Sequence, residues 1–321
     1  MFLRLHTQYR SFIEYILPNS TRRREFYRIF VRVFRVLLSE GPIGLWRHAQ
    51  SYWRNWINRQ VRRDPILIYQ MGKVGSLSLL EATKNAYQDL SLDTPIYHCH
   101  SLMDFEKYEI FIKTKMGNSK AEFNGLERDK KLRSEIDSHP DQLWNLISLV
   151  RDPVARNIAA FFQNIDYYVP GWKEQWENKT LSISKLLEYF FANDEINAPV
   201  WFETKLEPIF GIDVYSTPFP QKVGYKIYQN PPRANLLLIR LEDLNHAGVG
   251  AVKKYLKLPS FTLQRTNVGH EKSYADIYNV FRQTPMPKFY VERMYSTRLA
   301  KHFYTKDELA AFAYKWTRKI S

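Results

Sequence analysis

Between residues 66 and 80 the chain reads ILIYQMGKVGSLSLL, where a lysine stands between two glycines and a serine follows. Gly72 and Gly75 let a backbone approach a ligand closely, while Lys73 and the Ser76 hydroxyl supply charge and a hydrogen bond. Backbone N–H groups in such a turn can bind a phosphate. An ordinary strand-to-helix turn with an exposed lysine fits the same letters. The stretch is not a Walker A motif, which places its lysine directly after the second glycine.

A second group of reactive residues lies in the stretch IYHCHSLMDF. If this stretch begins as a strand, His98 and His100 share one face and Cys99 lies on the other. A histidine at a strand end suits a general base, because its ordinary pKa is about 6.5. A structural histidine pair is one alternative. A metal site that includes Asp104 is a weaker alternative, because no further ligand motif accompanies it.

The stretch LISLVRDPVARNIAAFF places Arg151 after an apolar run and immediately before a helical pattern. An arginine at this position can bind a second phosphate through two parallel hydrogen bonds. Asp152 can cap the helix that follows. The alternative is an ordinary pair between Arg151 and Asp152 across the turn.

Alternating strand and helix patterns position these residues. The segments PILIY, TPIYHCH, LWNLISLV, VGYKIYQN and NLLLIRLEDL are predicted strands, and helical patterns separate most of them. The alternation predicts an α/β fold with a parallel sheet flanked by helices. Ligands bind such sheets beyond the carboxyl ends of the strands. We therefore expect the chemistry directly after Tyr69, Tyr97, Val150 and Ile239.

Charge divides the 321-residue chain, whose net charge is +14. Residues 1–63 contain 13 arginines, three glutamates and no lysine. We predict a basic amphipathic helical extension over residues 1–63 and an α/β domain over residues 64–321. The extension lacks the apolar run of roughly 20 residues that a membrane span needs, but it could lie on an anionic membrane surface. Solvated helices that pack on the main domain are the alternative, and we expect no nucleic-acid partner.

The single cysteine, Cys99, excludes an intrachain disulfide and favours a reducing compartment. It predicts a cytoplasmic protein. Peripheral contact with the inner face of the membrane is one of the two alternatives that the basic extension leaves open.

These strand ends, taken together, resemble the sulfotransferases that use 3′-phosphoadenosine 5′-phosphosulfate (PAPS). KVGSL is similar to the loop that binds the 5′-phosphosulfate, although Leu77 replaces a threonine. RDPVARNIAA is similar to the motif that binds the 3′-phosphate, with Ala159 where the family has serine; Arg156 and Asn157 are the candidates to compensate. YHCHSLMDF resembles the His-x-His segment of the uronyl 2-O-sulfotransferase branch. There the second histidine is the base, which here is His100.

Further segments extend the resemblance over residues 64–275. NLLLIRLEDL resembles a strand and turn of the family, and RTNVGHEKSY resembles the late loop that closes over the donor. The resemblance implies a P-loop-type, sulfotransferase-like fold, PAPS as donor and no metal. The implied catalytic residues are Lys73, His100 and its neighbour His98. The residues predicted to bind the donor are Gly72, Lys73, Val74, Gly75, Ser76, Leu77, Arg151, Asn267, Gly269 and Lys272.

A narrower resemblance concerns YQMGKVGS, VRDPVARNIAAFFQN and NVGHEKSY. They are similar to bacterial capsular polysaccharide synthesis proteins, and the basic N-terminus resembles leaders of cell-surface polysaccharide enzymes. This implies a polysaccharide or glycolipid acceptor. The candidate sugar-stacking residues are Tyr167, Tyr168, Trp172, Trp176 and Trp201, with Lys205 beside them, although aromatic side chains of this kind are more often packing residues. Two rival functions stay open, an ATP-dependent kinase-like enzyme and a non-catalytic protein that binds membranes or polyanions.

Overall fold

The computed structural model describes residues 64–116, 119–193, 198–263 and 272–318. The predicted N-terminal extension, residues 1–63, lies outside the described residues, as do Asn267 and Gly269. The domain boundary at residue 64 therefore stays a prediction. Within the described ranges, no helix combines the length and the apolar character that a membrane crossing requires.

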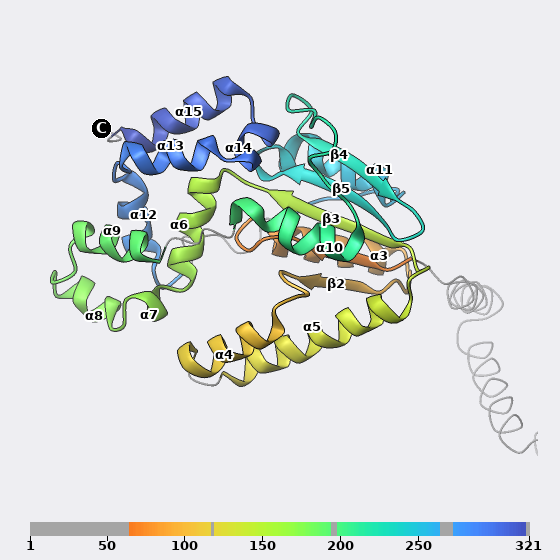
Figure 1. The fold of residues 1–321 in the computed structure, drawn as a ribbon, viewed down its shortest axis with the longest axis horizontal. Helices are drawn as coiled ribbons and strands as arrows, with labels where there is room; N and C mark the ends of the chain where they lie inside the picture. Colours follow the sequence, from red (N-terminus) through yellow and green to blue (C-terminus); the bar gives the residue numbers. More distant parts are fainter. Residues whose placement is uncertain (1–63, 117–118, 194–197, 264–271, 319–321) are drawn as a thin grey trace, which may run out of the picture. The chain divides into compact units, whose positions relative to one another are not determined.

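A five-stranded sheet organises the fold, in the order β2-β1-β3-β5-β4 (Figure 1). Its strands are β1 (Ile66–Tyr69), β2 (Ile96–Cys99), β3 (Trp144–Val150), β4 (Tyr225–Asn230) and β5 (Ala234–Arg240). The pairs β1–β2, β1–β3 and β3–β5 are parallel, which confirms the predicted α/β fold. β4 is antiparallel to β5, because only the short turn at Pro231–Arg233 joins them.

The strand order places a topological switch point at the centre of the sheet. From β1 the chain passes to β2 on one side, and it later returns to β3 on the other side. The loops that follow β1 and β3 therefore diverge at the carboxyl ends of these strands, which is the place where open α/β sheets bind ligands. Residues 70–75 and Arg151 lie in these two loops.

Helices and short helical turns make up most of the rest of the described chain. They are α3 (Ser76–Asp89), α4 (Phe105–Lys115), α5 (Lys120–Ser138), α6 (Pro153–Gln163), α7 (Ile165–Tyr168), α8 (Trp172–Glu177), α9 (Ile183–Ala192), η1 (Ala198–Val200), η2 (Phe202–Leu206), α10 (Glu207–Phe210), η3 (Leu241–Asp243), η4 (Leu244–Gly248), α11 (Val249–Tyr255), α12 (Ala275–Gln283), α13 (Lys288–Ser296), α14 (Arg298–Phe303) and α15 (Lys306–Thr317).

The two faces of the sheet pack against different helices. Tyr69 points to the face covered by α10, where its ring centroid lies 5.9 Å from that of Phe210. His98 points to the opposite face, and its Nε2 lies 2.9 Å from the Ser76 hydroxyl at the start of α3. Figure 1 shows α10 and α3 on opposite sides of the sheet. This agrees with the alternation of side chains along paired strands.

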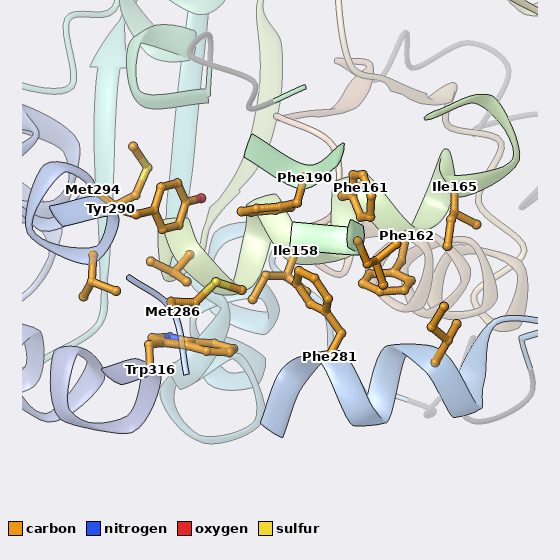
Figure 2. Packing of buried hydrophobic residues seen from close by; sticks show 14 of the residues in the cluster. Ile158, Phe161, Phe162, Ile165, Phe190, Phe281, Met286, Tyr290, Met294 and Trp316 are labelled. Carbon is orange, nitrogen blue, oxygen red and sulfur yellow. The ribbon is translucent and has the colours of Figure 1, made fainter. Parts of the chain in front are cut away.

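A second apolar core surrounds α6, away from the sheet (Figure 2). Ile158, Phe161 and Phe162 of α6 are almost fully buried in it. Phe281 of α12 packs on Phe162, with ring centroids 5.2 Å apart. Since fully burying side chains of this size stabilises a fold by about 1.5–3 kcal/mol each, the cluster fixes α6 firmly. Arg151 immediately precedes this helix.

Asp152 connects the end of β3 to the C-terminal helices. Asp152 is 4% exposed, and its carboxylate caps α6 by accepting a hydrogen bond from Val154 N at 3.0 Å. It also accepts bonds from the Tyr295 hydroxyl at 2.9 Å and from Trp316 Nε1 at 2.8 Å. The predicted cap is confirmed, and its further partners explain how α13 and α15 are held beside this strand end.

We expect Asp152→Asn to destabilise the protein by about 1–3 kcal/mol, the usual cost of leaving a buried hydrogen-bond donor without a partner. The amide oxygen can still cap α6, but the amide nitrogen cannot accept the indole N–H of Trp316. Urea unfolding measures the change. Asp166→Asn is the matched control, because Asp166 also accepts an indole N–H, from Trp172, but at an exposed position. Equal losses in the two variants would contradict the role given to burial.

Candidate functional site

The turn between β1 and α3 contains two glycines, and the space available for a side chain differs between them. Gly75 has a φ of 86°, and a Cβ there would lie 2.7 Å from Leu241 Cδ1, so the fold itself needs glycine. Gly72 has no such constraint, since nothing lies within 4 Å of where its Cβ would be. Packing therefore does not explain Gly72, and the open space beside it leaves room for a ligand.

The N-terminus of α3 has the properties of an anion site. Its N-cap, Gly75, offers no side chain to cap the helix, and the first turn contains no acidic residue. The first N–H groups of a helix lack intrahelical partners and carry partial positive charge. Val74 is fully buried, whereas Leu77 is exposed, so these two residues can offer a ligand at this site mainly their backbone N–H groups.

Lys73 stands at this helix end in a left-handed conformation with a φ of 70°. Its Nζ donates a hydrogen bond to Gln163 Oε1 at 2.6 Å. Desolvation by the surrounding protein lowers the Lys73 pKa to about 8, and the positive charges of Lys272 and Arg156 lower it further in the same direction. Lys272 from the predicted late loop is thus close enough to act on Lys73 electrostatically. An anion bound among these cations would relieve their repulsion.

Two arginines hold the turn through its carbonyl groups. Arg151 Nη1 donates to the Lys73 carbonyl at 3.0 Å, and Arg156 Nε donates to the Gly72 carbonyl at 3.1 Å. The structure thus brings Arg151 to the β1 loop, as the strand-end argument expected. Asn157 instead points into the α6 core, where its Nδ2 donates to the Tyr290 hydroxyl at 3.1 Å. Asn157 is therefore not placed to replace the missing serine at Ala159.

His100 has the tautomer that a general base requires. Its Nδ1 lies 3.0 Å from the Gln70 carbonyl oxygen, which can only accept, so Nδ1 carries the proton. In the neutral ring Nε2 then has a free lone pair. Desolvation lowers the His100 pKa, and the charges of Lys73 and Arg156 add to this, while the bond to Gln70 opposes it. His100 is exposed to solvent as a residue, although the surrounding protein desolvates its ring. His100 is thus a neutral, reachable base at pH 7.

His98 supports this arrangement from the same strand face. Its ring packs edge-on against that of His100, with centroids 4.9 Å apart. Desolvation, followed by the nearby charges of His100 and Arg128, lowers the His98 pKa to about 4. Its Nε2 is hydrogen-bonded to the Ser76 hydroxyl, so this hydroxyl, predicted to bind the donor, faces His98 in the structure.

Asp104, the third member of the alternative metal site, turns away from the histidines. Its carboxylate forms an ion pair with Lys205, and Lys107 lies 3.6 Å away. Across the part of the chain that the structure describes, no three His, Cys, Asp or Glu side chains gather as metal ligands would. Asp104 therefore acts as an ion-pair partner.

Two glutamines of the site were missed by the sequence analysis. Gln70 is fully buried, and its side-chain Oε1 and Nε2 have no hydrogen-bond partner within the described residues. A polar residue directly after an apolar strand was the signal available in the sequence. Gln163, the partner of Lys73, gives no such signal, because it lies 90 positions away and only the fold brings the two together.

Two of the tryptophans proposed for sugar stacking, Trp172 and Trp201, are packing residues. Trp172 is 4% exposed and Trp201 is 7% exposed. The indole of Trp201 lies 4.9 Å from the Tyr69 ring. Tyr168 stacks on Phe161 of the α6 core. Packing therefore explains these rings without a carbohydrate.

The comparisons with known proteins concern the C-terminal part of this arrangement. Residues 176–305 match the NKWYS family model, described as "Putative capsular polysaccharide synthesis protein". No curated protein and no solved structure shows a significant match. The matched segment covers less than half of the chain. It contains Lys272, Trp201 and Lys205, but it excludes Lys73 and His100. The match shows that this segment is similar to a family with a suggested role in capsular polysaccharide synthesis, and it specifies no sulfuryl donor.

Proposed function

We propose that the protein transfers a sulfuryl group from PAPS to a hydroxyl of a carbohydrate acceptor during capsular polysaccharide synthesis. One observation carries the proposal. Arg156 and Lys272 both act on Lys73 at the uncapped start of α3. The charges of Lys73 and Arg156 also act on His100, whose Nδ1 is held by the Gln70 carbonyl so that Nε2 is unprotonated. An anion site beside a neutral base is what transfer from an anionic donor to a hydroxyl requires.

The residues present suit the two phosphate groups of this donor. The N–H groups at the start of α3 and the open space beside Gly72 would receive the 5′-phosphosulfate. Arg151 uses one of its five N–H donors on the Lys73 carbonyl. Its remaining donors would bind the 3′-phosphate, which distinguishes PAPS from ATP. The absence of a serine at Ala159 leaves Arg151 as the principal ligand of that phosphate.

The reaction is an exchange of one sulfur–oxygen bond for another. The acceptor hydroxyl oxygen forms a bond to sulfur as the bond from sulfur to the bridging phosphate oxygen breaks. The hydroxyl proton passes to His100 Nε2. Lys73 stabilises the negative charge that develops on the phosphate oxygen, and the second product is adenosine 3′,5′-bisphosphate. His98 and Gln70 hold the imidazole of His100 in the orientation described above.

The pKa values of His100 and Lys73 predict a bell-shaped dependence of kcat/KM on pH. His100 must be neutral, so activity falls as pH drops through its pKa, which lies below the ordinary value of 6.5. Lys73 must be protonated, so activity falls again as pH rises through about 8. Because kcat/KM reports the free enzyme, these limbs follow the unliganded pKa values. In the pH profile of kcat, the alkaline limb should move to higher pH, since a bound phosphate favours the charged form of Lys73. An alkaline limb at the same pH in both parameters would contradict the contact between Lys73 and the donor.

Calorimetric titration tests the choice of donor against its rivals. We expect adenosine 3′,5′-bisphosphate to bind without magnesium, and Gly72→Val to weaken this binding by filling the space beside the turn. Gly125→Val is the control, because Gly125 also has nothing within 4 Å of its Cβ position but lies in α5. ATP binding that requires magnesium would instead favour the kinase-like enzyme. Binding of neither nucleotide would favour the polyanion-binding protein, and either result overturns the proposal.

A further inference from the structure

Three contacts tether the segment that follows β2, residues 100–104, to one helical stretch, residues 201–206. Trp201 Nε1 donates to the His100 carbonyl at 3.0 Å. The Tyr69 hydroxyl donates to the Lys205 carbonyl at 3.0 Å and accepts from Leu102 N at 3.3 Å, which joins the two segments through one buried side chain. The ion pair between Lys205 and Asp104 is the third contact. We call these contacts the η2 clamp.

The backbone at both ends of the η2 clamp is unusual. Asp104 precedes α4 in a left-handed conformation with a φ of 57°, and its side chain makes no capping bond to that helix. An aspartate at this position normally adopts an extended conformation and caps the helix. Here its carboxylate pairs with Lys205 instead. Lys205 belongs to η2, a single π-helical turn, a form that is rare and frequent at functional sites. A strained backbone conformation such as that of Asp104 persists only where the surrounding contacts hold it in place.

The η2 clamp and the sheet act on different parts of His100. The Gln70 carbonyl holds Nδ1 of the ring, and the ring of His98 packs against its side. Trp201 holds the backbone carbonyl from the opposite face of the sheet. Together these contacts set the direction in which Nε2 points. The sheet alone cannot do this, because β2 ends at Cys99, one residue before His100.

We propose that η2, together with its N-cap residue Trp201, positions His100, with Trp201 and Lys205 as positioning residues. The proposal rests on the proposed function for the importance of His100, but the geometry can be tested without it. Removing the Lys205 charge or the Trp201 indole N–H should loosen residues 100–104. The His100 ring then samples other orientations, loses its fixed bond to Gln70 and becomes more exposed to water.

Nitrogen NMR of the labelled histidine rings, without any nucleotide or acceptor, measures this directly. The chain has eight histidines, and the spectrum of His100→Gln identifies the signal of His100. In the wild type we expect a single tautomer protonated at Nδ1. In Lys205→Ala and in Trp201→Phe we expect a mixture of tautomers and a His100 pKa that rises toward 6.5. Lys205→Arg keeps the ion pair and should restore the wild-type signal.

The control is Lys185→Ala, which removes an exposed lysine from its 2.7 Å pair with Glu188 in α9. Thermal unfolding verifies that each variant is folded at the temperature of the NMR measurement. If Trp201→Phe does not fold, Lys205→Ala decides the question. A wild-type tautomer and pKa in Lys205→Ala would overturn the proposal. If the tautomer changes in Lys205→Ala but the wild type shows no sulfuryl transfer, the role of the η2 clamp is supported and the proposed function is wrong.

Discussion

His100→Gln should lower kcat by about 10²–10⁴-fold, the usual contribution of a general base, while the affinity for adenosine 3′,5′-bisphosphate changes little. Glutamine preserves much of the size of the side chain but cannot take up the acceptor proton. Because His100 is exposed to solvent as a residue, added imidazole should restore part of the activity of His100→Ala. Steady-state kinetics and calorimetry together separate the loss of catalysis from the loss of binding.

His139→Gln is the control for this experiment, because His139 is exposed and its ring contacts Ser138 and the Glu135 carbonyl at the end of α5. Near-normal turnover in His100→Gln would show that the base is another group. Loss of nucleotide affinity in that variant would show that His100 acts mainly in donor binding.

Lys73→Ala should lower kcat by about 10²–10³-fold, the cost of removing one group that stabilises charge in a transition state. The affinity for adenosine 3′,5′-bisphosphate should fall as well, because Lys73 is one of the cations at the start of α3. Lys113→Ala, which removes an exposed lysine of α4, is the control and should change neither quantity.

Lys73→Arg tests more specifically whether the charge of Lys73 is what the reaction needs. Arginine stays protonated above pH 12, so the alkaline limb of kcat/KM near pH 8 should disappear even where some activity remains. If the limb persists in Lys73→Arg, another group titrates there and Lys73 does not carry the charge that the reaction needs.

Much of the fold could be predicted from local patterns. The five strands, the helices beginning at Ser76 and Pro153, and the opposite orientations of His98 and Cys99 follow from apolar runs, helical spacing and strand alternation. The alternation of strands and helices implied an all-parallel sheet, but the short turn at Pro231–Arg233 forces β4 to run antiparallel. That turn length was visible in the sequence and should have decided the direction.

The site was predictable only in part, because its contacts join distant segments. Lys73, His100 and Arg151 lie where the strand ends placed them. Their partners could not be read from the sequence: Gln163 lies 90 positions from Lys73, and Trp201 lies 101 positions from His100. The aromatic pattern around Trp201 left a sugar platform and packing both open, with packing the more common role, and the fold buries that ring beside Tyr69. The roles assigned to the donor residues stay predictions.

Incubation with ³⁵S-labelled PAPS and a panel of capsular and other acidic and neutral polysaccharides tests the central claim most directly. We predict transfer of label to at least one polysaccharide by the wild type, with adenosine 3′,5′-bisphosphate as the other product. We also predict loss of this transfer in Lys73→Ala and in His100→Gln, but not in His139→Gln. Transfer that survives in both site variants, or binding of PAPS without transfer to any polysaccharide, would contradict the account.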